Sequence, residues 1–137
     1  MNYADAQLNC QNKFGNLVGQ LFEPRLSNTN QLVSTAAANF VSETSDCFWL
    51  GMNDLAIQGQ FVYASDGTTA GSSQVGSGMW WSDQPNDLGG SRCVGYYELQ
   101  KYGGGWFDRP CDFLSFSICE QKGTDLVNQI VIQIIIK

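Results

Sequence analysis

The central segment CFWLGMND, residues 47–54, has the composition of a buried strand. The run from Cys47 to Gly51 is short, apolar and rich in aromatic side chains, which pack well on a pleated surface. Shorter segments of similar composition follow it and are also expected to be strands: residues 61–63, 94–99, 106–107 and 116–120. The centre and the second half of the chain therefore predict a β-sheet.

Two segments that precede this run have apolar residues at helical spacing, residues 1–14 and residues 28–43. Residues 64–92 are rich in Gly, Ser, Thr, Asn and Asp and predict a long loop region. Long ordered loops in compact domains are usually functional. The three glycines at 103–105 predict a turn between two strands.

Composition limits what the chain can do. Its 137 residues, 43% apolar and 15% charged, make one folded domain. The net charge of −6 opposes binding to nucleic acid phosphates. The chain has no histidine, which removes Ser-His and Cys-His nucleophiles and His-containing zinc sites. No convincing nucleophile or carboxylate pair replaces them, so we do not expect an enzyme.

Five cysteines, at positions 10, 47, 93, 111 and 119, indicate an oxidising compartment with two disulfides and one cysteine left over. Their spacing leaves the pairing open, and five reduced cysteines in a cytosolic protein are the alternative. No signal peptide is visible in residues 1–30, and no stretch reaches the ~18–20 apolar residues of a transmembrane segment. We expect an extracellular or secreted protein.

The tail QIVIQIIIK, residues 129–137, alternates with a period of two and is β-branched, which favours a strand over a helix. Left unpaired, such a strand is an aggregation hazard. A paired extra strand and a disordered tail are both open.

An ordered series of motifs resembles the C-type lectin-like domain. The motifs are MNYADAQLNC at 1–10, Trp49-Leu50-Gly51, Gly59-Gln60-Phe61 with Asp66-Gly67, Trp81, Gln84-Pro85-Asn86, Trp106-Phe107-Asp108 before Cys111, and Ile118-Cys119-Glu120. The resemblance covers residues 1–121 and leaves 122–137 as a tail. It implies an α+β fold with two helices flanking small antiparallel sheets and a long loop region.

The resemblance also implies the disulfides Cys10–Cys119 and Cys93–Cys111. Cys47 is then expected as a buried thiol rather than as an intermolecular disulfide. The family's usual first strand, which pairs with the last strand, is absent. We expect the tail to turn back through residues 123–125 and pair with 116–120, which would cover the bare edge. Cys47 and the tail are also possible contacts of a homodimer.

Sugar-binding members of the family bind through a calcium ion, which needs six to eight oxygen ligands. The resemblance places Gln84 and Asn86 at the first two ligand positions, on either side of a cis Pro85, and Asp108 at the last. Each of these residues would contact both the ion and the sugar.

Three other residues depart from the family pattern. Ser91, Arg92 and Phe107 stand at usual ligand positions, although Ser91 still offers a hydroxyl. Because only one charged ligand is left, we expect calcium binding weaker than ~1 mM, or none. Asp87 or Asp112 would compensate if the loop were rebuilt.

A second, structural calcium position of the family retains Asp54 and Asp87, but Gln58 and Arg92 stand where acids are common. We expect Arg92 to supply the missing positive charge by pairing with Asp87 or Asp54. The alternative is a solvated arginine on a loop.

Adjacent tryptophans on a strand face opposite ways. Trp81 matches a buried position of the family and is expected in the core, with Trp49 and Trp106. Trp80 is then a candidate to stack on the apolar face of a sugar ring.

The expected function is non-enzymatic carbohydrate binding around Gln84-Pro85-Asn86 and Asp108, with calcium weak or absent. The tripeptide mixes galactose-type and mannose-type patterns, so it does not name the sugar. The alternative is calcium-independent recognition of a protein through an apolar patch containing Phe107 and Trp80. The expected partner is thus a glycan or glycoprotein, or a protein.

Overall fold

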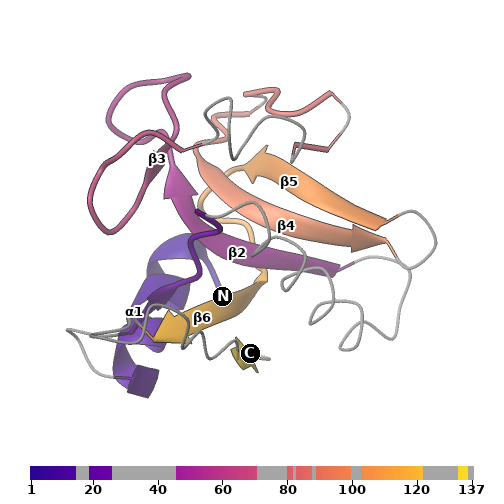
Figure 1. Cartoon of the computed structure of the whole chain (residues 1–137). Helices are drawn as coiled ribbons and strands as arrows, with labels where there is room; N and C mark the ends of the chain where they lie inside the picture. Colours follow the sequence, from indigo (N-terminus) through magenta and orange to yellow (C-terminus); the bar gives the residue numbers. More distant parts are fainter. Residues whose placement is uncertain are drawn as a thin grey trace.

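A computed structural model describes residues 1–14, 19–25, 46–70, 80–81, 83–87, 89–99, 103–121 and 133–135. One helix, α1 (Tyr3–Phe14), lies across one end of a twisted sheet (Figure 1). The strands are β1 (Gly19–Leu21), β2 (Asp46–Asn53), β3 (Val62–Tyr63), β4 (Cys93–Leu99), β5 (Gly103–Arg109), β6 (Phe116–Gln121) and β7 (Gln133–Ile135). The predicted α+β class and first helix are confirmed. The second predicted helix, residues 28–43, lies outside the described residues.

The described strands form one mixed sheet rather than small antiparallel sheets. Its main order is β1-β6-β2-β4-β5, with β3 paired to β2 and β7 paired to β6. Strands β1, β6 and β7 join the remaining strands through the parallel pairing of β6 with β2. In this pairing Phe48 lies opposite Phe116, and Trp49 lies opposite Ser117. The other strand pairs are antiparallel.

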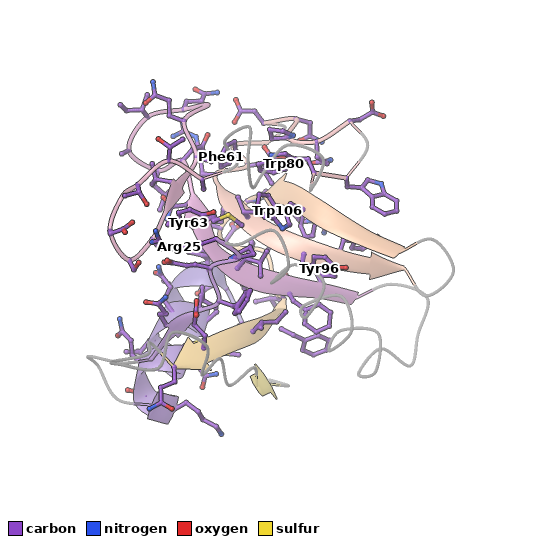
Figure 2. All side chains as sticks on the ribbon, viewed as in Figure 1. Arg25, Phe61, Tyr63, Trp80, Tyr96 and Trp106 are labelled. Atoms are coloured by element: carbon purple, nitrogen blue, oxygen red, sulfur yellow. A yellow bond between two sulfur atoms is a disulfide. The ribbon has the colours of Figure 1, made fainter. Side chains whose placement is uncertain are left out.

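Strand β2 is buried on both faces, which explains its nearly continuous apolar sequence. Phe48, Leu50 and Met52 belong to one core cluster, together with Tyr96 and Trp106 (Figure 2). On the other face Trp49 packs with residues of α1: Tyr3, Ala6 and Cys10. The placement of Trp49 and Trp106 in the core is confirmed, since both side chains are fully buried.

Both expected disulfides are present. Cys10–Cys119 joins α1 to β6, and Cys93–Cys111 joins the start of β4 to the segment after β5. Cys47 lies outside both. Its side chain is half-buried rather than buried, because it sits near the end of β2 opposite the half-buried Tyr97.

A salt-bridged arginine ties the segment after β1 to the turn after β3. The Arg25 guanidinium lies 2.7 Å from Glu23 and 2.9 Å from Asp66, and 4.2 Å from the centre of the Tyr63 ring (Figure 2). The hydrogen bond from Arg25 holds the pKa of Asp66 well below its usual range. Ser65 also donates to Glu23 from its backbone N–H and its hydroxyl.

One local prediction is wrong, and the short strand β1 was not predicted. Residues 103–105 are part of β5 rather than a turn, with Gly105 opposite Tyr97 in β4. A Cβ atom at Gly105 would lie 2.9 Å from the backbone nitrogen of Trp81. Glycine is therefore required there for a close approach of two backbone segments, which also determines where Trp81 sits.

The tail contributes strand β7, which pairs with the edge of β6 that was expected from the sequence to be bare. In β7, Ile135, Ile134 and Gln133 pair with Ser117, Ile118 and Cys119 of β6. Figure 1 accordingly shows the yellow strand β7 beside β6. The expected turn at 123–125 lies outside the described residues. No helix in the described part of the chain is long and apolar enough to cross a membrane.

Ending the chain after Gln121 removes β7 and leaves one edge of β6 unpaired. We expect a lower melting temperature and faster aggregation, because backbone N–H and C=O groups of β6 lose their partners. Thermal unfolding and light scattering measure both effects. A chain that ends after Ile135 keeps β7 and is the control. Equal melting and solubility of the two shortened chains would contradict a structural role for β7.

Candidate functional site

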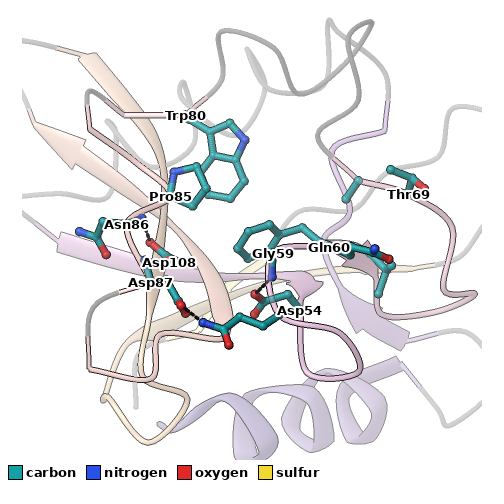
Figure 3. A pocket seen from close by; sticks show the side chains of 13 residues that line it. Asp54, Gly59, Gln60, Thr69, Trp80, Pro85, Asn86, Asp87 and Asp108 are labelled. Atoms are coloured by element: carbon teal, nitrogen blue, oxygen red, sulfur yellow. Dashed lines mark hydrogen bonds between the residues drawn. The ribbon is translucent and has the colours of Figure 1, made fainter.

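The loop Gln84–Asp87 is held against strand β5 by one buried carboxylate. Asp108, 4% exposed, accepts the backbone N–H of Asn86 on Oδ1 at 2.8 Å and that of Asp87 on Oδ2 at 2.7 Å (Figure 3). In return, the backbone N–H of Asp108 donates to Oε1 of Gln84 at 3.3 Å. The Gln84–Pro85 bond is cis, as expected. The structure thus brings Gln84, Asn86 and Asp108 together.

This arrangement does not fit the first calcium position. Calcium requires six to eight oxygen ligands. Both carboxylate oxygens of Asp108 and the amide oxygen of Gln84 already accept backbone hydrogen bonds. Phe107 is buried and offers no side-chain oxygen, and Ser91 is buried as well. Within the described residues, no three His, Cys, Asp or Glu side chains form a group that could hold a metal ion.

At the second calcium position, the carboxylates of Asp54 and Asp87 accept hydrogen bonds from the protein itself. Oδ2 of Asp54 accepts the N–H of Gly59 at 2.8 Å, and Nε2 of Gln58 donates to Oδ2 of Asp87 (Figure 3). Arg92 donates to the backbone oxygen of Asp54 at 3.3 Å and to Oε1 of Gln58 at 3.4 Å. Oδ1 of Asp54 is buried without a partner. With Gln58 and Arg92 in place of acids, the two carboxylates of Asp54 and Asp87 supply too few oxygens for calcium, so these residues do not fit the ion either.

The ion pair expected for Arg92 is not formed. Its guanidinium bonds two neutral oxygens, and neither is a carboxylate of Asp54 or Asp87. Asp112, the other carboxylate considered, is exposed and lines neither of the pockets described next.

Two pockets flank the loop, and both include Asn86 and Asp108. The Trp80 pocket, of about 690 Å³, is lined by Asp54, Gln58, Gly59, Gln60, Phe61, Val62, Thr69, Ala70, Trp80, Pro85, Asn86, Asp87 and Asp108 (Figure 3). The Trp81 pocket, of about 470 Å³, is lined by Trp81, Gln84, Asn86, Ser91, Tyr97, Phe107, Asp108, Arg109, Pro110 and Phe113.

Trp80 and Trp81 are both half-buried and line different pockets, so Trp81 is not the core residue that was expected. Trp80 packs against the core, with its ring 5.1 Å from Phe61 and 5.6 Å from Trp106 (Figure 2). Trp81 is half-buried, packs edge-to-face on Tyr97 at 6.3 Å and lines the Trp81 pocket. Backbone pairing holds Trp81 in this position, since its N–H donates to the backbone oxygen of Trp106 at 2.7 Å. The expected exposed patch of Phe107 and Trp80 is also wrong, because Phe107 is 5% exposed.

Tyr97, Arg109 and Phe113 line the Trp81 pocket, although they were not predicted from the sequence. Phe107 and Arg109 are two apart on β5, so they point to the same face of the sheet. That period-two spacing is the signal that places Arg109 beside an aromatic ring. Phe113 follows β5 across a turn, and only the folded chain brings it back over Arg109.

Replacing Asp108 by Asn tests how the loop is held. An Asn side chain keeps the shape but has one acceptor oxygen, so one of the two loop N–H groups loses its partner. We expect the free energy of unfolding to fall by about 1–3 kcal/mol, measured by urea denaturation. Asp83→Asn is the matched control, because Asp83 is exposed and its positive φ also suits Asn. Equal stability of the two variants would show that these bonds do not hold the loop.

Comparison with known proteins gives a consistent result. The sequence profile of the lectin C-type domain matches residues 1–121. Collectin-10 of Gallus gallus is 30% identical over 122 residues, 87% of this chain and 38% of that protein. The low affinity immunoglobulin epsilon Fc receptor of Mus musculus is 37% identical over 78 residues, 56% of this chain and 20% of the receptor. The chain spans well under half the length of these relatives.

Solved structures share the fold at low identity. The C-type lectin CEL-I from Cucumaria echinata has a TM-score of 0.70 at 18% identity, covering 87% of this chain and 81% of that one. The mouse scavenger receptor C-type lectin carbohydrate-recognition domain has a TM-score of 0.65 at 20% identity, covering 90% and 83%. Since the profile match extends over most of the residues and the two disulfides agree with it, this chain belongs to the C-type lectin domain family.

Proposed function

We propose that this domain binds glycans at the Trp81 pocket, without catalysis and without calcium. The hydrogen bonds between Asp108 and the loop carry this proposal. They use the same oxygens that the family resemblance assigns to calcium, and they hold the loop by themselves. A site that is rigid without an ion does not need the ion to present its side chains.

The composition of the Trp81 pocket suits a sugar ring. Small-ligand sites combine aromatic surfaces with a few well-placed polar groups. Trp81 and Tyr97 supply ring surface for the apolar C–H face of a sugar. Gln84 and Asn86 line the same pocket and carry amides that hydrogen-bond hydroxyl groups. These four side chains are uncharged, as are the hydroxyl groups of a sugar.

The relatives support a glycan as partner. One solved relative is by name a carbohydrate-recognition domain, and another is by name a C-type lectin. Two disulfides in a small domain support an extracellular location, because such bonds persist in oxidising compartments.

Calcium is expected to leave the folded state unchanged. A ligand that binds only the native state raises the melting temperature once its concentration exceeds its dissociation constant. We therefore expect the same melting temperature in millimolar calcium and in excess chelator, measured by calorimetry. A calcium-dependent rise would contradict the assignment of the oxygens of Asp108 and Gln84 to internal bonds.

Glycan binding is tested on immobilised glycans in chelator-containing buffer. We expect binding to persist in chelator, and Trp81→Ala and Asn86→Ala each to weaken it about tenfold or more, since each removes a direct contact. Asn12→Ala is the matched control for Asn86→Ala, because it removes an exposed amide from α1. Loss of binding in chelator, or equal binding by all three variants, would contradict the proposal.

A protein partner is the second candidate. Among the described residues, four of the five exposed large apolar residues lie in two loops, and each is 40–59% exposed: Leu55 and Ile57, and Phe113 and Leu114. Exposed apolar groups of this kind occur at protein interfaces. Binding that fails on Leu55→Ser or Leu114→Ser but survives Asn86→Ala would favour this candidate over a glycan.

A further inference from the structure

The Trp81 pocket contains an arginine held between aromatic rings. Arg109 is the last residue of β5. Its guanidinium carbon lies 4.2 Å from the centre of the Phe113 ring, 4.7 Å from that of Phe107 and 6.0 Å from that of Tyr97. Such contacts orient the planar group through its faces and leave the N–H donors at its edge for other partners.

Those donors are not used by the described part of the chain. Arg25 donates to Glu23, Ser65 and Thr68, and Arg92 donates to two neutral oxygens. The guanidinium of Arg109 forms neither a hydrogen bond nor an ion pair with any described residue. Of the three arginines in the sequence, it is the one whose side chain has no acceptor among the described residues.

The charges around the pocket favour an anion at this point. Among the residues that the structure describes, Arg109 and Asp108 are the charged ones that line it. Asp108 is buried and directs both carboxylate oxygens to the backbone of the loop, whereas Arg109 is half-buried and therefore reachable. A carboxylate matches the fork of a guanidinium with two parallel hydrogen bonds. The same pocket offers Trp81 and Tyr97 to the ring that carries the carboxylate.

From this geometry we infer that the Trp81 pocket selects acidic sugars, whose carboxylate Arg109 binds while the ring packs on the aromatic side chains. The inference rests on the proposed function and adds the substrate class. The net charge of −6 opposes an anion at long range. That repulsion is screened beyond ~8 Å at physiological salt, whereas a contact inside the pocket is screened much less.

The test compares two sugars that differ in one group. Methyl glucuronide carries a carboxylate where methyl glucoside carries a hydroxymethyl group, and the ring is otherwise the same. Binding is followed by NMR on the indole N–H of Trp81, assigned with Trp81→Phe, in chelator at physiological salt. We expect the glucuronide to bind about fivefold more tightly, the upper range for a partly exposed ion pair.

Variants then assign that preference to one residue. Arg109→Gln should bind both sugars equally, at about the affinity of the wild type for the glucoside. Arg92→Gln is the matched control, since it removes the same charge from a nearby loop residue that does not line the pocket, and it should keep the preference. Arg109→Lys keeps the charge without the fork and should retain part of it. A preference that survives in Arg109→Gln would overturn the role of Arg109.

The wild-type comparison separates this inference from the proposed function. Equal binding of both sugars would overturn the acidic-sugar class and leave glycan binding standing. If neither sugar moves the Trp81 signal, the pocket is not the sugar site, and both proposals fail. Because this comparison needs no variant of Arg109, it holds even if Arg109→Gln does not fold.

Discussion

Burial of the Asp108 carboxylate is the constraint on which the candidate site depends. A charge taken out of water costs several kcal/mol unless hydrogen bonds replace its hydration. The N–H groups of Asn86 and Asp87 replace it here, so the loop cannot leave β5 without exposing an unpaired charge. The β4–β5 ladder and the Cys93–Cys111 disulfide hold Asp108 in turn. The loop separates the two pockets, and its position sets the shape of both.

The residues that match the family pattern, Gln84, Asn86 and Asp108, are present and close together. The side-chain oxygens of Gln84 and Asp108 accept backbone hydrogen bonds within the chain. At the second position, Arg92 and the amide of Gln58 lie where acids would be needed. The positive charge of the site comes instead from arginine, with Arg92 bonded internally and Arg109 held by rings and available to a ligand.

Strand composition and the resemblance predicted most of the scaffold. The apolar run in β2, the helix at the start and both disulfides were all foreseen. Predictions failed where a residue type has two uses. The three glycines at 103–105 predicted a turn, but they belong to β5, where Gly105 allows the backbone of Trp81 to come close. Trp80 and Trp81 have the same chemistry, so only their pairing with Trp106 decides which pocket each of them lines.

The order of residues established a small domain without histidine chemistry and with a helix before a sheet, because composition and periodicity are local properties of the chain. The α+β class and the disulfide pairing followed from the resemblance of its motifs to the family. Which partner each polar group binds is decided only when the chain folds. Whether the Asp108 carboxylate binds a metal ion or accepts backbone N–H groups depends on residues that are more than 20 positions away in sequence. The same holds for Arg109, whose partners Tyr97 and Phe113 reach it from β4 and from the turn after β5. Hydrogen bonds and ring contacts act over a few ångströms, so tertiary packing alone determines which groups a ligand can reach.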